Sequence, residues 1–235
     1  MKVIFKYYLI LTSAAILLTG CDKSSDLIYI IQDPWVHYGS LTDRDGNIYK
    51  TIQIGTQTWM VSNLKTTRLN DGTKIPVVNS SYSWDTLSVQ GCCWLDNNPT
   101  YRVTYGILYN WHAVNSGKLC PSGWHAPSDN EWKVLIDYLG GESGAGGKLK
   151  EAGLSHWYSP NNGATNDTYF RALPGGYRSV TDSLYHDLHQ AGYWWTTSGI
   201  GDNAFVHSMN SLDNFVHREF LPKRSGFSVR CVWDY

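Results

Sequence analysis

The chain has 235 residues, of which 17% are charged, and its formal net charge is -1. Binding to a phosphate backbone requires a field of basic side chains, so this composition excludes a nucleic-acid partner. The chain carries 11 Trp and 16 Tyr against 6 Phe. Trp and Tyr combine a flat apolar face with a hydrogen-bonding edge, and they therefore suit both sheet-rich cores and wet binding surfaces.

Residues 1–20 have the features of a secretory signal peptide. Lys2 and Lys6 precede an apolar run over residues 7–18, and small residues occupy positions 19 and 20. The run is shorter than the roughly 20 residues that a membrane-spanning helix needs. Residues 18–21 read LTGC and resemble a lipobox, in which Cys21 is lipidated and becomes the first residue of the mature chain. We therefore expect a lipid anchor in the cell envelope, at the periplasmic face of the outer membrane or at the cell surface.

Removing residues 1–20 from the 235 leaves 215, which suits one domain with a sizeable core. We interpret residues 21–40 as a tether and residues 41–235 as the domain. Alternation around the turns at 45–46 and 54–55 predicts successive β-strands. Asp43, Asp45 and Asn47 also suggest calcium, but Gly46 stands at the fourth position and not at the sixth, where an EF-hand loop has its glycine. We expect a hairpin turn there.

The clearest helix is predicted over residues 128–139. Ser128 and Glu131 form a capping box, and glycines at 140–141 end the helix. Apolar residues at i, i+3, i+4 and i+7 place Trp132 on the face that packs against a core. Further helices are expected over residues 105–114 and 147–151.

Beyond residue 153 the chain is rich in turns, with short strands expected at 170–173, 193–198, 204–208 and 227–233. Short strands between long polar loops indicate an α+β domain, not a parallel βαβ array. Four cysteines remain besides Cys21, namely Cys92, Cys93, Cys120 and Cys231. In an oxidising compartment they predict disulfides with three alternative pairings. No spacing typical of a zinc site supports metal binding.

Seven strings in order closely resemble the Fibrobacter succinogenes major paralogous domain. They cover nearly the whole chain from residue 41 to 235: DGNIY (45–49), IGTQTWM (54–60), YGILYNW (105–111), LCPSGWHAP (119–127), FRALPGGYR (170–178), GYWWT (192–196) and GFSVRCV (226–232). Members of that family are mostly exported lipoproteins whose molecular function is largely unassigned.

The resemblance implies a C-type lectin-like α+β fold with short antiparallel strands, two or three short helices and long loops. This fold group includes the formylglycine-generating enzymes. The resemblance to them implies a disulfide between Cys120 and Cys231. In the chain-entropy model, closing a loop of about 110 residues contributes several kcal/mol. Cys92 and Cys93 are then the remaining candidate disulfide.

An enzyme is the alternative that the same resemblance suggests. Formylglycine-generating enzymes oxidise a cysteine with copper that two nearby cysteines hold, and no such pair follows Cys120. Adjacent Cys92 and Cys93 could bind a soft metal, although disulfide formation is favoured over metal binding in an oxidising compartment. Iron-dependent relatives use histidines, which are dispersed here. We therefore expect a binding module, with a metal-dependent oxidase as the alternative.

Several loop residues are candidate ligand contacts. Five aromatic side chains in or beside loops could stack on sugars: Trp157, Tyr158, Tyr177, Tyr185 and Trp194. Alternation along the strand places at least one of the neighbouring tryptophans 194 and 195 in the core. Calcium is a minor alternative at Asn161, Asn166 and Asp167, where we favour a hydrogen-bonded loop and expect no cofactor.

Arg171, Arg178 and Arg230 are expected to anchor loops by hydrogen bonds to carbonyls or carboxylates. The sequence as a whole predicts a lipid-anchored, non-catalytic binding or adhesion module. Its expected partners are the membrane, through the anchor, and a polysaccharide or a surface protein. A purely structural component of the cell surface is the further alternative.

Overall fold

The computed structural model describes residues 36–234, except for the side chain of Tyr82, and the compact unit begins at His37. The signal peptide, Cys21 and most of the tether predicted from the sequence lie outside these residues. Within residues 36–234, no helix is long and apolar enough to cross a membrane.

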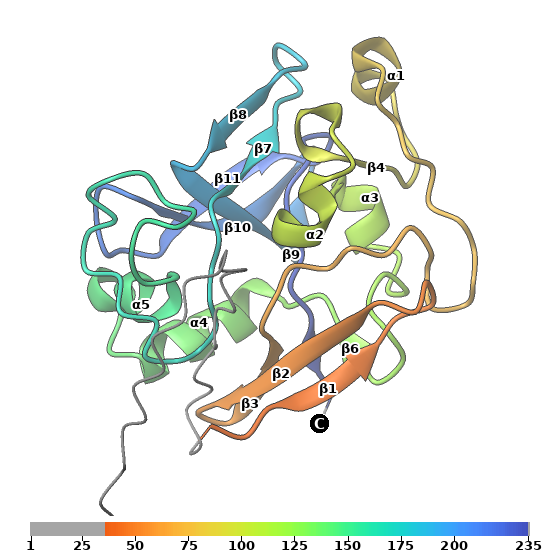
Figure 1. The fold of residues 1–235 in the computed structure, drawn as a ribbon. Helices are drawn as coiled ribbons and strands as arrows, with labels where there is room; N and C mark the ends of the chain where they lie inside the picture. Colours follow the sequence, from red (N-terminus) through yellow and green to blue (C-terminus); the bar gives the residue numbers. More distant parts are fainter. Residues whose placement is uncertain (1–35, 235) are drawn as a thin grey trace, which may run out of the picture. The chain divides into compact units, whose positions relative to one another are not determined.

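The first sheet joins the beginning of the compact unit to its end (Figure 1). Its strands are β1 (Gly39–Thr42), β2 (Ile48–Ile54), β3 (Gln57–Met60), β6 (Trp124–His125) and β12 (Val232–Trp233). They lie in the order β1-β2-β3-β12-β6, and every pairing is antiparallel. The last strand thus lies inside the sheet, where it pairs with residues far away in the sequence.

The turn between β1 and β2 confirms the predicted hairpin. Asp43 Oδ1 accepts the backbone N–H groups of Asp45 and Asn47, each at 2.9 Å. Asp43 Oδ2 accepts the hydroxyl of Tyr49 at 2.5 Å. Gly46 adopts φ 80°, a left-handed conformation that glycine takes without steric cost. The carboxylate of Asp43 is therefore engaged in holding the turn.

The second sheet contains the long C-terminal strands. It consists of β7 (Gly175–Arg178), β8 (Tyr185–Leu188), β9 (Ala191–Ile200), β10 (Asn203–Asn210) and β11 (His217–Pro222). The order is β11-β10-β9-β7-β8, with β7 and β9 parallel and the other pairs antiparallel. β4 (Cys92–Cys93) and β5 (Leu108–Tyr109) form a small third sheet. Mixed sheets with short helices confirm the predicted α+β class.

The longest helix of residues 36–234, α4 (Asp129–Tyr138), has the predicted capping box. The Ser128 hydroxyl accepts the backbone N–H of Glu131 at 3.2 Å, and the Glu131 carboxylate accepts the backbone N–H of Ser128 at 2.7 Å. Trp132 is fully buried, as expected, with ring centroids 5.2 Å from Trp59 and 6.2 Å from Trp194. This helix thereby packs against side chains of both large sheets.

The single helix predicted over residues 105–114 is wrong. Two short helices occupy this region, α2 (Tyr101–Tyr105) and α3 (Trp111–Val114). Gly106 follows α2 at φ 81°, and a Cβ on it would lie 2.8 Å from the Leu64 carbonyl oxygen. The backbone N–H of Ile107 donates to that same carbonyl at 3.0 Å. The close approach of residue 64 therefore ends the first helix.

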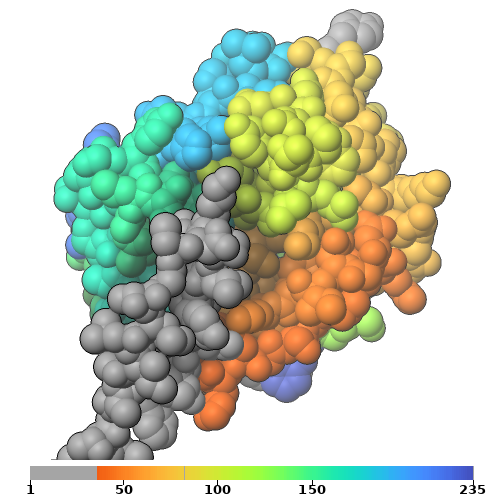
Figure 2. All heavy atoms as spheres, viewed as in Figure 1, coloured from red at the N-terminus to blue at the C-terminus, as the bar shows by residue number. Residues whose placement is uncertain are grey.

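Residues 36–234 contain three further short helices. They are α1 (Ser81–Asp85), the 3-10 helix η1 (Leu95–Asn97) and α5 (Glu142–Leu149). α5 begins five residues before the helix predicted at 147–151. In Figure 2 the light-blue β8 segment lies beside the yellow-green segment that contains η1, and the Tyr185 hydroxyl donates to Asn97 Oδ1 at 2.8 Å.

The predicted disulfide between Cys120 and Cys231 is present, with the two Cα atoms 6.0 Å apart. Both sulfurs lie in the main hydrophobic core. Cys231 directly precedes β12, and Cys120 lies shortly before β6, the strand that pairs with β12. The bond thus fastens the C-terminal strand to the segment that leads into α4.

Two fully buried arginines hold loops, as the sequence predicts. Arg178 Nη1 donates to the Val78 carbonyl at 2.7 Å. Arg230 donates to the Phe170 carbonyl, and to Asn63 Oδ1 at 2.9 Å. Burial lowers the pKa of Arg230 to about 9, and the nearby positive charge of Arg171 acts in the same direction.

Candidate functional site

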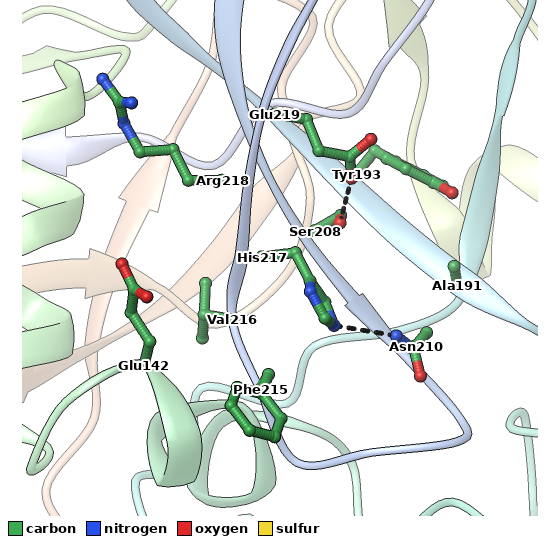
Figure 3. A pocket seen from close by; sticks show the side chains of 10 residues that line it. All are labelled: Glu142, Ala191, Tyr193, Ser208, Asn210, Phe215, Val216, His217, Arg218 and Glu219. Carbon is green, nitrogen blue, oxygen red and sulfur yellow. Dashed lines mark hydrogen bonds between the residues drawn. The ribbon is translucent and has the colours of Figure 1, made fainter.

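A cleft of about 580 Å³ opens over β9, β10 and β11, near the edge of the second sheet (Figure 3). Its volume falls in the range of about 300–1,000 Å³ that is usual for small-molecule sites. The lining residues are Glu142, Ala191, Tyr193, Ser208, Asn210, Phe215, Val216, His217, Arg218 and Glu219. Most of these side chains can form hydrogen bonds.

The register of the three strands decides which side chains line the cleft. Ser208 of β10 lies opposite Tyr193 of β9 on one side and opposite His217 of β11 on the other. Val206, two residues earlier on the same face, is fully buried in the core and lies opposite Glu219. The Ser208 hydroxyl donates to the Glu219 carboxylate. Alternate residues of a strand share one face of the sheet. On this face of β10, Val206 therefore belongs to the apolar core, while Ser208, two residues later, lines the polar cleft.

The loop between β10 and β11 is held by side chains that bond to nearby backbone. Asn210 Oδ1 accepts the N–H groups of Leu212 at 2.8 Å and Asp213 at 3.1 Å. Asp213 Oδ1 accepts the N–H of Phe215 at 2.9 Å. These are Asx turns, which fix short loops. At Gly146 of α5 a Cβ would lie 2.2 Å from the Phe215 carbonyl oxygen, so glycine is needed for the loop to pack against this helix.

A buried lysine fixes the same loop. Lys150 is fully buried, and its Nζ donates to the carbonyls of Asn210 at 2.9 Å, Asp213 at 2.6 Å and Asn162 at 2.9 Å. Burial lowers the pKa of Lys150 to about 8. The ammonium thereby satisfies three carbonyls from two separate loops, which would otherwise be costly to bury.

His217 can bind two different partners in this loop. Its Nε2 lies 3.0 Å from Asp213 Oδ2 and 3.0 Å from Asn210 Nδ2. A protonated Nε2 donates to the carboxylate, whereas an unprotonated one accepts from the amide. Burial alone would raise the pKa of Asp213, but hydrogen bonds from Phe215 N–H and Asn210, together with His217, hold it below its usual value.

Tyr193 lines the cleft beside these polar groups and packs against Tyr177. Their ring centroids are 5.0 Å apart in an edge-to-face arrangement, and both rings contact Phe227 of the core. The Tyr193 hydroxyl donates to Asp187 Oδ2 at 2.7 Å. Burial and this hydrogen bond raise the pKa of Tyr193 well above its usual value. The phenol thus stays neutral, and its ring is held in place.

The five aromatic residues predicted as ligand contacts do not form one surface. Trp157 and Trp194 are each 1% exposed, and the prediction that they bind ligand is wrong. The indole N–H of Trp157 donates to a backbone carbonyl at 3.1 Å, and that of Trp194 donates to a side-chain amide at 2.8 Å, so both are anchored inside the core. Tyr185 is half-buried against the Arg178 guanidinium.

The other two aromatic candidates are accessible. Tyr158 is 55% exposed and packs against His189, with ring centroids 5.1 Å apart. Tyr177 is half-buried and contacts Tyr193, which lines the cleft. Tyr177 thus contacts a lining residue of the cleft but does not line the cleft itself.

Hydrogen bonds hold the polar loop over residues 161–167, where calcium is the alternative suggested by the sequence. Asn161 is buried, and its amide donates to the Glu151 carbonyl at 2.9 Å. Asn166 Oδ1 accepts the N–H of Arg171 at 2.9 Å, while Asp167 is exposed. The Arg171 guanidinium donates to the Glu151 carboxylate at 2.8 Å, as expected of a loop anchor. Among residues 36–234, no three His, Cys, Asp or Glu side chains gather closely enough to hold a metal ion.

Cys92 and Cys93 are both free, so the predicted bond between them is wrong. They are consecutive residues of β4, and consecutive strand side chains point to opposite faces. Cys92 packs in the main core and Cys93 in a separate cluster. Burial raises the pKa of Cys93 to about 11. The two thiols therefore do not form the paired copper ligands that the oxidase alternative needs.

Tyr193, His217 and Glu219 were not singled out from the sequence. Residues 217–222 read HREFLP, three polar residues followed by Phe, Leu and Pro, so this run lacks the alternation of polar and apolar residues that identifies a half-exposed strand. Only the pairing register places His217 and Glu219 beside the polar end of β10.

Residues 52–233 match the sequence model of the Fibrobacter succinogenes major domain. This match spans most of the chain and all the residues of the cleft. The name of this family states no activity and no ligand. No curated protein and no solved structure matches this chain significantly.

Proposed function

This chain belongs to the Fibrobacter succinogenes major domain family, and we propose that it is an exported, lipid-anchored, non-catalytic module that binds glycans. The glycan occupies the cleft over β9, β10 and β11. The observation that carries the proposal is the combination of an aromatic side chain held in place, Tyr193, with several hydrogen-bonding side chains in one cleft of about 580 Å³.

Sugars present apolar C–H faces and a ring of hydroxyls. The ring of Tyr193 suits the first, while the side chains of His217 and Glu219 suit the second. Asx turns and Lys150 hold the loop that carries Asn210. A site that is already ordered loses little entropy when the ligand binds.

The proposal also includes the anchor and the fold family. Cys21 carries the lipid at the outer membrane, and the tether holds the domain at the periplasmic face or at the cell surface. For the fold we propose a C-type lectin-like arrangement. It is supported by the pairing of the last strand with early strands and by the bond between Cys120 and Cys231.

A glycan array and affinity electrophoresis on soluble polysaccharides test the cleft. We expect His217→Ala and Glu219→Gln to weaken binding at least 10-fold, a loss of about 1.4 kcal/mol. Tyr138→Ala is the matched control, because Tyr138 is 65% exposed on α4 and does not line the cleft. If the native protein binds no glycan, or if the control variant loses as much affinity as the other two, the proposal fails and a structural role is favoured.

Acylation is tested separately. We expect intact-mass measurement to find a diacylglyceryl group on Cys21 and to find the chain cut before it, and Cys21→Ser should move the protein out of the membrane fraction. A Cys21→Ser protein that remains in the membrane fraction would contradict the anchor without affecting the cleft.

A further inference from the structure

A second cleft, of about 600 Å³, lies between residues 67–77 and residues 94–102. These segments are yellow to yellow-green in Figure 2. The lining residues are Thr67, Arg68, Lys74, Ile75, Pro76, Val77, Trp94 and Arg102. None of them belongs to the first cleft.

The lining of this cleft is positively charged. Arg68, Lys74 and Arg102 all contribute, and no acidic residue is among the described residues that line it. The charge of Arg68 is compensated by the Asp45 carboxylate behind the cleft, so the net positive charge of the lining comes from Lys74 and Arg102. The first cleft instead has two carboxylates, Glu142 and Glu219, against one arginine, Arg218. The two clefts therefore favour ligands of different charge.

Both arginines are held in place by groups behind the cleft. Arg68 Nε lies 3.1 Å from Asp45 Oδ1, and Asp45 Oδ2 accepts the backbone N–H of Thr67 at 2.6 Å. Arg102 Nε donates to the Lys65 carbonyl at 3.0 Å. Because these contacts already order the guanidinium groups, little side-chain entropy remains to be lost when an anion binds.

The apolar part of the lining suggests what kind of anion fits. Trp94 is half-buried, and the Arg102 guanidinium lies 6.0 Å from its ring centroid. Residues 75–77, an Ile-Pro-Val run, also line the cleft. A small inorganic anion would use the charges alone. A flat indole and an aliphatic lining beside three cations suit a ligand that has both an apolar face and acidic groups.

We propose that this second cleft binds an anionic saccharide, whose acidic group is a carboxylate or a sulfate. The acidic group pairs with Lys74 and the arginines, and the C–H face of the sugar packs on Trp94. This assignment does not depend on the function proposed for the first cleft.

Affinity electrophoresis with paired polysaccharides tests the assignment. Polygalacturonate is compared with its fully methyl-esterified form, and dextran sulfate with neutral dextran. We expect one or both charged polymers to retard the protein and the neutral partners to leave it unaffected. A carboxylate ligand shows only in the first pair and a sulfate ligand only in the second. If neither charged polymer is bound, or if each neutral form binds equally well, the proposal is overturned.

Variants then locate the binding. Lys74 is exposed, so Lys74→Gln should leave folding intact while it weakens binding at least 5-fold, and Lys74→Arg should restore it. Lys133→Gln is the matched control, because it removes an exposed positive charge on α4, outside the cleft. Equal losses for the two glutamine variants would mean attraction by net charge alone and would refute the site. Glu219→Gln should leave this binding unchanged.

Discussion

Replacing Cys120 and Cys231 together by alanine should cost this protein much of its stability. The disulfide spans 111 residues of sequence, and in the chain-entropy model a bridge over a loop of that length contributes about 5 kcal/mol. Small domains unfold with a free energy of about 5–15 kcal/mol. The double variant should therefore be close to unfolding at room temperature.

Urea unfolding followed by tryptophan fluorescence measures this loss. The matched control is the Cys92→Ala/Cys93→Ala variant, which also removes two buried sulfurs but leaves the loop closed. We expect a clearly smaller loss for the control. A reductant should destabilise the native protein and the control, but not the variant without the bridge. The reasoning is refuted if both double variants lose the same free energy, or if the bridge variant loses less than about 2 kcal/mol.

Two further predictions concern charged side chains that are held by hydrogen bonds. Lys150→Met should destabilise the protein by about 3 kcal/mol, because three carbonyls lose their donor at about 1 kcal/mol each, and it should speed proteolysis between Asn210 and Asp213. Lys133→Met, at an exposed position, should do neither, and an equally stable Lys150→Met protein would contradict the anchoring role. Hydrogen bonds from His207 and Arg218 hold the pKa of Asp129 far below its usual 3.8. The resulting stabilisation is complete above about pH 4 and is lost as pH falls through the lowered pKa. The difference in unfolding free energy between the native protein and Asp129→Asn should therefore shrink from pH 6 to pH 2. A difference that stays constant over this range would rule out the linkage.

Local sequence signals predicted several elements correctly. The capping box of Ser128 and Glu131 depends on contacts three residues apart, and so it can be recognised without tertiary structure. The same holds for the hairpin turn at residues 43–47. The pairing of Cys120 with Cys231 followed from family resemblance, and not from local chemistry.

Contacts between distant residues decided what the sequence could not. Trp157 and Tyr158 are neighbours in one loop, yet the first is 1% and the second 55% exposed. Membership of a loop does not reveal which side chain turns inward. The helix predicted over residues 105–114 is interrupted at Gly106, because the Leu64 carbonyl comes close to this residue. The spacing of apolar residues along a helix cannot reveal such a contact with a distant residue.

By itself, the sequence determined the α+β class, the capped helix, the hairpin turn and the family, because each depends on short-range spacing or on an ordered set of motifs. The lipid anchor at Cys21 stays a prediction. Only the tertiary structure decided where a ligand could bind. The cleft forms because the register of β9, β10 and β11 places Tyr193, Ser208 and His217 side by side, while Lys150, far away in the sequence, holds the loop beside them. Register is set by the burial of a whole sheet face, which requires all the strands together.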